Sequence, residues 1–459
     1  MRIKRSEGLT PSERFLSELC DGTFLKLWSY PNPYKADGKE LCDLLAVFED
    51  HVFLFFDRES RKFDKPGRDT LLTWERWRKE AIEKQILTSS GAKKYISQYP
   101  NQIYLDAKKS TPFPIGVPSN NPHIHKIIVA HGAAEACKKF SSANVSGSLA
   151  VAYGDFGNRY PFPFMVDLAR NDPVHILDSH NLEIIFSELD TFYDLACYLI
   201  AKETAIEQLN YLAYCGEEDL LAHYFLNFDG HNYFVGSKDK TINGVFVSEG
   251  QWQDFAKSDA YQRRKKANEV SYLWDQIMQR TCQNALDGVL LGDANIFDSR
   301  NAIQEMAKEP RFSRRALSEA MINAINGFPN NQEGIVRNLS FMPSFYKDKG
   351  YVFLQIRHPN ITDYEKEYRA RRSKMLQIAC GAAKIKFSYL NKVIGIAIDA
   401  PKFSERNSED FVLLNCEKWS ERDTARYQEA NRGLQFFETK TMKVQEKTIS
   451  DFPPADSAS

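Results

Sequence analysis

The chain has 459 residues, of which 43% are hydrophobic and 26% are charged. One hydrophobic core rarely serves so long a chain, so we expect two or three folded domains. The 60 lysines and arginines almost balance the 61 aspartates and glutamates. This balance excludes a partner chosen by net charge alone, and any nucleic-acid site must be local. No stretch approaches the ~20 apolar residues of a membrane span, so we expect a cytoplasmic protein without a membrane partner.

The eight cysteines are scattered along the chain, without a CxxC pair or a cysteine–histidine cluster. Such spacing argues against a structural zinc site or a disulfide framework. We expect most of the cysteines to be small buried hydrophobic residues.

Thr10, Pro11 and Glu13 suit the N-cap, N1 and N3 positions of a helix that starts with a capping box. The first helix is therefore predicted to begin here. An apolar, aromatic segment follows at residues 24–30. Pro31-Asn32-Pro33 breaks that segment, and the next element begins at the turn Asp37-Gly38.

Two apolar runs come next, at residues 44–48 and 52–56, separated by a polar triplet. They are continuous rather than alternating, which favours two central strands of a sheet that is covered on both faces and joined as a hairpin. The pattern then predicts a helix at 74–86, strands at 103–105, 124–130 and 148–152, and a long helical stretch at 189–212.

The expected fold class is α/β in several domains. We place a first domain at 1–210, a mainly helical domain with a hairpin around 233–247 at 211–330, and an α+β domain at 331–440. Residues 441–459 are expected to be a disordered tail.

Acidic residues stand at the ends of the two paired runs. Asp43 precedes the first run, and Asp57, Arg58 and Glu59 follow the second. Carboxylates at neighbouring strand ends can hold a hard divalent ion against a phosphodiester, and a nearby cation would stabilise the charge that develops on the phosphate. This pattern predicts a site for Mg²⁺ or Mn²⁺.

In this arrangement residues 10–90 resemble the PD-(D/E)XK superfamily of restriction-endonuclease-like nucleases, most closely its nuclease-related-domain type. The resemblance implies a mixed sheet flanked by helices, a helix that carries a Glu, a strand that opens with Asp, and a hairpin strand that ends in Glu-x-Lys. Asp43 fits the metal-binding Asp, and Glu13 or Glu18 fits the helical Glu.

The third motif departs from the family pattern. With the strands laid side by side, the Glu and Lys positions fall on Phe56 and Arg58. Arg58 keeps the positive charge but cannot act as a base, and Asp57 could supply the missing acid where a bulge turns it inward. The resemblance thus implies Asp43 and Asp57 as ligands with Glu59 beside them, Glu13 and Glu40 as assisting acids, and Arg58 as a phosphate clamp.

Each of these residues also has a structural interpretation. Glu13 stands where a helix cap needs it, Glu40 could be a surface charge, and residues 57–59 could be an ordinary polar strand end. For Asp43, metal binding and structural hydrogen bonding both remain open.

Three basic clusters could track a phosphate backbone if they shared a face with nearby tyrosines. Solvated helix faces are the simpler interpretation of each one. The predicted nucleic-acid-binding residues are Arg263, Arg264, Lys265, Lys266, Arg369, Arg371 and Arg372, and the remaining cluster is Arg311, Arg314 and Arg315.

Two other patterns are weaker. Asp155-Phe156-Gly157 resembles the kinase metal motif, but without a glycine-rich loop or an HRD motif it predicts a turn. His123 and His125, with His131 following, could bind metal from one side of a strand. A strand that passes through a polar loop explains these histidines more simply.

The leading hypothesis is therefore a Mg²⁺- or Mn²⁺-dependent DNA endonuclease, with the rest of the chain as a recognition, sensing or oligomerisation module. A role in restriction or phage defence follows by analogy alone. The alternatives are a catalytically inactive nuclease fold that binds nucleic acid or a protein, and a subunit that needs a partner. Cutting both strands of DNA would suit a homodimer.

Overall fold

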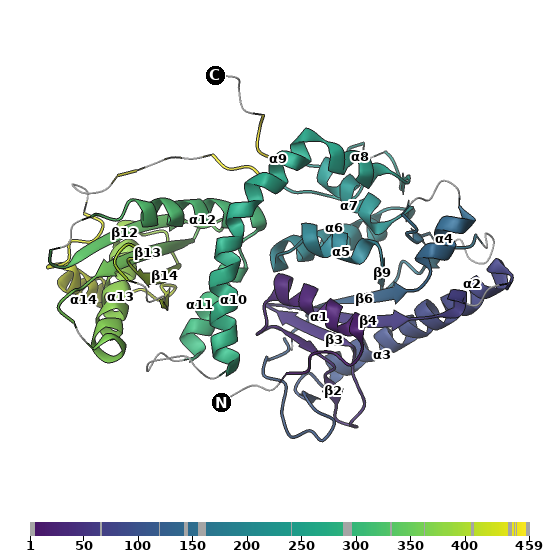
Figure 1. The fold of residues 1–459 in the computed structure, drawn as a ribbon, viewed down its shortest axis with the longest axis horizontal. Helices are drawn as coiled ribbons and strands as arrows, with labels where there is room; N and C mark the ends of the chain where they lie inside the picture. Colours follow the sequence, from purple (N-terminus) through teal and green to yellow (C-terminus); the bar gives the residue numbers. More distant parts are fainter. Residues whose placement is uncertain are drawn as a thin grey trace. The chain divides into compact units, whose positions relative to one another are not determined.

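The structure is a computed structural model, and it describes residues 5–64, 67–118, 120–141, 146–154, 162–239, 241–287, 296–330, 333–361, 363–404, 408–438, 443–444, 446 and 448–455. The chain divides into two compact units. The N-terminal unit is Lys4–Tyr261, and the C-terminal unit is Gln262–Ser459 with Met1–Ile3 (Figure 1). No helix in the described ranges has the length and apolar character needed to cross a membrane.

The N-terminal unit is built on a five-stranded mixed sheet in the order β1-β3-β4-β6-β9. The pairs β1–β3 and β3–β4 are antiparallel, and β4–β6 and β6–β9 are parallel. All of β3 and the first six residues of β4 are buried, as their continuous apolar runs predicted. The strands are Ser29–Pro31, Leu44–Phe48, His51–Glu59, His123–His131 and His175–Asp178.

Helices cover both faces of this sheet. Helix α1 (Pro11–Phe24) begins directly after Thr10, which caps it as predicted, and its Phe24 ring lies 4.6 Å from the ring of Phe53. The connection from β4 to β6 contains the 3₁₀ turn η1 and a long helical segment, of which the predicted helix at 74–86 is part. Its pieces are η1 (Lys62–Asp64), α2 (Thr70–Arg78), the π-helical η2 (Lys79–Glu83) and α3 (Lys84–Gln98).

A second sheet, in the order β11-β10-β7-β8, completes the unit together with the two-stranded pair β2–β5. Its strands are Gly244–Val247, Tyr211–Tyr214, Ala150–Tyr153 and Met165–Leu168, and the short pair is Tyr34–Lys35 with Ile103–Tyr104. The helices here are α4 (Ala134–Phe140), α5 (Asn181–Glu188), α6 (Phe192–Gln208), α7 (Glu217–Leu226) and α8 (Gln251–Lys257).

Three sequence expectations need correction here. Residue 330 is not a domain boundary, because the helices before it and the sheet after it belong to one unit. Residue 210 is not a domain boundary, because β10 pairs with β7 and so belongs to the same sheet. The hairpin expected around 233–247 is also wrong, because β11 pairs in parallel with β10 instead. The division between the units falls within α9 (Asp259–Asn268).

The C-terminal unit contains a four-stranded sheet in the order β12-β13-β14-β15, with one parallel pair, β13–β14, at its centre. The strands are Val336–Pro343, Lys349–Arg357, Lys392–Asp399 and Glu409–Asn415. The helical segments are η4 (Glu269–Ser271), α10 (Tyr272–Asp287), α11 (Ile296–Ala307), α12 (Arg311–Asn326), the π-helical η5 (Tyr364–Tyr368), α13 (Arg369–Lys386) and α14 (Glu421–Asn431).

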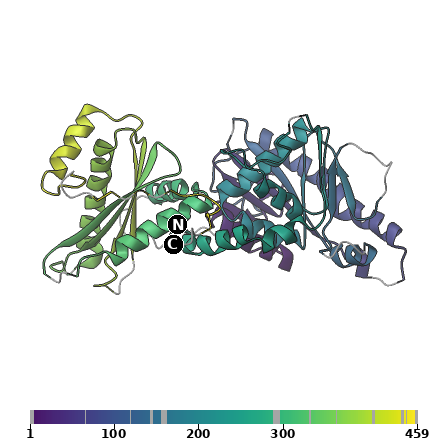
Figure 2. The ribbon, with the colours of Figure 1, turned by 90° about the horizontal axis from the view of Figure 1, so that it is seen from above.

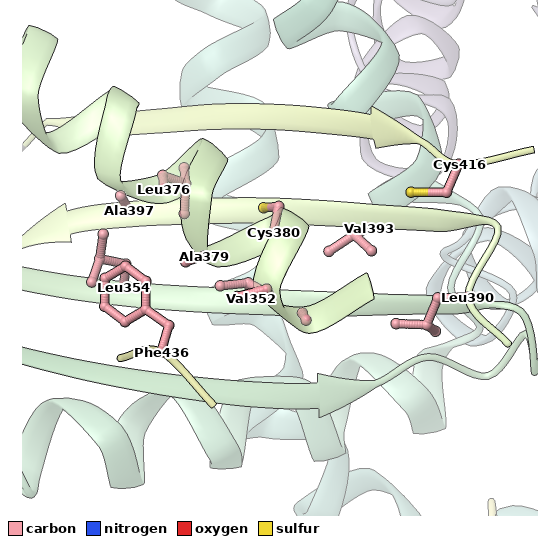
Figure 3. Packing of buried hydrophobic residues seen from close by; sticks show 12 residues of the cluster. Val352, Leu354, Leu376, Ala379, Cys380, Leu390, Val393, Ala397, Cys416 and Phe436 are labelled. Carbon is pink, nitrogen blue, oxygen red and sulfur yellow. The ribbon is translucent and has the colours of Figure 1, made fainter. Parts of the chain in front are cut away.

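This sheet lies between two helical layers (Figure 2). On one face Tyr351 of β13 meets Trp274 of α10 edge to face, with ring centroids 5.0 Å apart. On the other face Val352 and Leu354 belong to a core that Leu376 and other residues of α13 complete (Figure 3). The eight cysteines, all within the described ranges, form no disulfide with one another. Most of them are buried, as expected.

Candidate functional site

One edge of the five-stranded sheet gathers the carboxyl ends of β4, β6 and β9. Because β3 runs antiparallel to β4, the residue that opens β3 lies at the same edge. Asp43, Asp57, His131 and Asp178 all stand there. The carboxyl edge of parallel strands is where ligands of α/β sheets usually bind.

Asp43 and Asp57 are direct neighbours at this edge. The Oδ2 atom of Asp43 accepts the backbone N–H of Asp57 at 2.6 Å. Burial raises the pKa of Asp43 to about 8, and the negative charges of Glu40 and Glu13 add to the effect, although the N–H of Asp57 opposes it. A carboxyl group in this state holds its proton at neutral pH unless a cation is bound beside it.

His131 extends the site from the end of β6. Its Nε2 atom lies 2.7 Å from Oδ1 of Asp57, and its Nδ1 atom lies 2.9 Å from Oγ of Ser179. The Asp57 side chain is only 1% exposed. Two hydrogen bonds therefore hold the imidazole against the buried carboxylate.

Glu13 and Glu40 are joined by one amide group. Nδ2 of Asn32 donates to Oε2 of Glu13 at 3.0 Å and to Oε1 of Glu40 at 2.7 Å. Burial raises the pKa of Glu40, and the charge of Glu13 adds to it, while the amide of Asn32 opposes it. Glu13 also accepts the backbone N–H of Leu9 at 2.8 Å, so it helps to cap α1 as well.

These four carboxylates have amide and imidazole partners in the described part of the chain, and no lysine or arginine there pairs with them. Several acids without a balancing cation form an oxygen-rich, negative site. Hard divalent ions such as Mg²⁺ and Mn²⁺ prefer such ligands.

Arg58 and Glu59 are not part of this cluster. The guanidinium group of Arg58 lies 3.7 Å from Glu80 of η2, and its side chain is 48% exposed. Glu59 is half exposed and contacts Arg61 at 3.4 Å. Glu18 is exposed on α1.

The expected bulge is also absent, because β4 pairs with β6 in continuous register from His51 to Glu59. Strand alternation places Asp57 on the face that carries Phe53 and Phe55, which packs against α1. Arg58 falls on the opposite face. The register Leu44↔Phe55 sets Phe56 opposite Asp43, so the family's third-motif positions fall on Phe56 and Arg58, as the side-by-side strands implied.

Two of the arginines predicted to bind nucleic acid are interior. Arg264 is 2% exposed and pairs with Asp451 at 3.0 Å. Arg372 is fully buried and pairs with Asp399 at 2.8 Å and Asp410 at 2.6 Å. Neither guanidinium group can reach a phosphate without leaving its ion pair in the interior, so the surface interpretation of these two arginines is corrected.

Of the remaining basic residues, some have partners within the chain and others are exposed. Arg369 pairs with Asp410 at 2.8 Å, and Arg263 donates to the carbonyl of Pro453. Arg371 and Lys266 are exposed, and Lys265 is half-buried. The other cluster is buried too, in Arg311, Arg314 and Arg315.

Sequence reasoning missed Asn32 and the partnership of His131 with Asp57. The sequence does mark Asn32, because it stands between Pro31 and Pro33. In the structure its backbone is left-handed, with φ 50°. His131 directly follows a predicted buried strand, where side chains meet at a parallel-sheet edge. The Asp155-Phe156-Gly157 segment lies outside the described residues.

Comparisons with protein-family models, with curated proteins and with solved structures find no match to this chain.

Proposed function

We propose that this protein is a metal-dependent nuclease that hydrolyses phosphodiester bonds of DNA, with Mg²⁺ or Mn²⁺ held by Asp43 and Asp57. The observation that carries the proposal is that four carboxylates, from α1, the segment before β3 and the end of β4, lie along one sheet edge. The amide of Asn32 and the N–H of Asp57 link them in pairs, and the charges of the other three act on Asp43. Partial burial raises the pKa of Asp43 and its acidic neighbours raise it further, so this carboxyl group gains from a bound cation.

The order of the elements supports a restriction-endonuclease-like core. Glu13 lies on α1, Asp43 opens β3, and Asp57 lies near the end of the paired strand β4. The sheet is mixed and helices flank it. These are the features that the resemblance of residues 10–90 implies.

The residues of the cluster have separate roles in this proposal. Asp43 and Asp57 would hold the ion, which supplies polarisation of the phosphate and activation of a water molecule. Glu13 and Glu40, fixed by Asn32, would accept the proton of that water.

His131 could replace the missing lysine. Glu59 stands two residues after Asp57, where the motif expects Lys, and His131 is its register partner on β6. When protonated, the imidazole next to Asp57 would place a positive charge near the phosphate.

A second candidate is a catalytically inactive nuclease fold that binds nucleic acid or a protein partner. Two observations favour it: Glu59 occupies the lysine position, and Arg58 is turned toward Glu80 on the other face. A homodimer and a partner-dependent activity stay predictions of the sequence.

The test is to incubate the purified full chain with supercoiled plasmid, linear duplex, single-stranded DNA and RNA, each in Mg²⁺, Mn²⁺ and EDTA. We expect metal-dependent cleavage of DNA, reduced at least about 100-fold in Asp43→Asn and Asp57→Asn, as for loss of one preorganised electrostatic group. Glu18→Gln, exposed on the same helix as Glu13, is the matched control and should cleave normally.

Undiminished cleavage by folded Asp43→Asn would remove the site from consideration. Absence of cleavage on all four substrates would move the assignment to the second candidate. Direct Mn²⁺ titration then separates a metal-binding scaffold from one that has lost its ligands.

A further inference from the structure

The opposite edge of the same sheet carries a second polar cluster. His125 lies near the start of β6, His175 opens β9, and Glu203 lies on α6. Both imidazoles are about 1% exposed, and the Glu203 side chain is 27% exposed. One nitrogen from each histidine and one carboxylate oxygen lie within 4.8 Å of one another, a grouping that recurs nowhere else in the described ranges.

The two rings converge on one atom. Nδ1 of His125 and Nε2 of His175 each lie 2.9 Å from the same Oε1 of Glu203. Ligands of a tetrahedral ion at ~2.0–2.1 Å are separated by roughly 3.3 Å, so an ion needs only a small adjustment of these side chains. Two buried imidazole rings from two strands thus converge with a carboxylate from a helix, which is the geometry that such an ion requires.

An outer histidine fixes the first ring. Nε2 of His125 lies 2.9 Å from Nδ1 of His51, and the two rings are stacked. The carboxylate of Glu203 accepts from Nδ1–H of His125, so Nε2 of His125 accepts from Nδ1–H of His51. An ion at Nδ1 of His125 would reverse this tautomer, and Nε2–H would then donate to His51, as metal-binding histidines do toward second-shell partners.

We propose that His125, His175 and Glu203 bind one divalent transition-metal ion, and that Zn²⁺ fits the site best. Two imidazoles and one carboxylate suit zinc, whereas Mg²⁺ and Ca²⁺ take oxygen ligands. The partly exposed Glu203 gives the ion a route from solvent.

The ion would tie β6, β9 and α6 together, and β6 also carries His131 of the carboxylate site at its other end. Among the histidines singled out from the sequence, His125 is a ligand, whereas His123 is exposed and His131 lies at the other sheet edge. The scattered cysteines argued against a structural zinc site, and this one uses no cysteine.

The test titrates the full-length, chelator-treated protein with Zn²⁺ by calorimetry and with Co²⁺ by visible absorption. We expect one equivalent to bind, with affinity lowered more than about 100-fold in His125→Gln and Glu203→Gln, beyond the effect of losing a second-shell partner. His123→Gln, two residues away on the same strand, is the control and should bind normally. Zn²⁺ should raise the melting temperature of the wild type and of this control, but not of Glu203→Gln.

The Glu203→Gln variant decides the matter if His125→Gln does not fold, because glutamine keeps an acceptor at a partly exposed position. Absence of Zn²⁺ binding by the folded wild type, or unchanged binding by folded Glu203→Gln, would overturn the proposal. The double variant Asp43→Asn/Asp57→Asn should still bind Zn²⁺; loss of binding there would place the ion at the carboxylate site instead.

Discussion

Asp43 combines a structural contact with an electrostatically unfavourable position. Its side chain accepts the N–H of Asp57. This contact continues the pairing of β3 and β4 beyond the pair Leu44 and Phe55. The same group lies buried beside Glu40 and Glu13, which raise its pKa. Structural hydrogen bonding at Asp43 is thus present, and metal binding there stays a prediction.

Replacing Asp43 by Asn is expected to stabilise the metal-free protein more at pH 8 than at pH 5. The pKa of Asp43 is about 8 in the folded state, against about 3.9 in an unfolded chain. The stability contributed by the protonated carboxyl is therefore complete below the unfolded pKa and is lost as the pH rises through about 8. Asn cannot ionise and avoids this loss.

Urea denaturation in EDTA at both pH values measures the effect. The gain of Asp43→Asn over the wild type should increase from pH 5 to pH 8 by more than about 1.4 kcal/mol, the equivalent of one pKa unit. Glu59→Gln, half exposed at the same edge, should show little change. An equal gain at both pH values would mean that the pKa of Asp43 is not raised in the folded protein.

Glycines inside helices differ in how closely other side chains pack against them. A Cβ atom on Gly381 of α13 would lie 2.0 Å from the ring of Tyr427 on α14. A Cβ atom on Gly91 of α3, in the N-terminal unit, would meet nothing within 4 Å. The same substitution, Gly to Ala, is therefore expected to have opposite effects on stability at these two positions.

We expect Gly381→Ala to destabilise the C-terminal unit by about 1–3 kcal/mol, because overpacking forces α14 away from α13. Gly91→Ala should stabilise the N-terminal unit by about 0.5–1 kcal/mol, because it removes a flexible residue from a helix interior. Native-state hydrogen exchange of β14 and of β4 reports the two effects separately.

Adding Tyr427→Ala to Gly381→Ala should recover part of the lost stability, since the clashing ring is removed. A cost that persists in the double variant would assign the effect to α13 alone.

At the scale of the whole chain, the N-terminal unit holds both the carboxylate cluster and the histidine cluster. We expect a chain ending at residue 261 to fold by itself and to keep both sites. A chain ending at 210 should not fold, because it removes β10 and also Glu217. Both carboxylate oxygens of Glu217 accept from the buried Lys202 at 2.7 Å.

Leaving Lys202 buried without Glu217 costs about 3–5 kcal/mol, and the lost strand adds to this. Circular dichroism and thermal unfolding of the two truncated chains provide the comparison. A cooperative transition in the chain ending at 210 would restore the boundary that the sequence suggested.

Features that depend on neighbouring residues could be read from the sequence. The capping of α1, the β3–β4 hairpin and the position of Asp43 before a buried strand follow from local patterns and are present in the structure. Hydrophobic periodicity identifies a buried strand because it reflects which faces avoid water. The nuclease assignment rests on this part of the chain and stays a proposal.

Only the tertiary structure decided which side chains meet. Asn32 joins Glu13 to Glu40, and His131 reaches Asp57 across 74 residues of sequence. Arg264 pairs with Asp451 across 187 residues of sequence, and this contact turns a predicted surface residue into an interior one. Local patterns record whether a residue is buried but not its partner, because a partner is chosen by packing between elements that lie far apart in the chain.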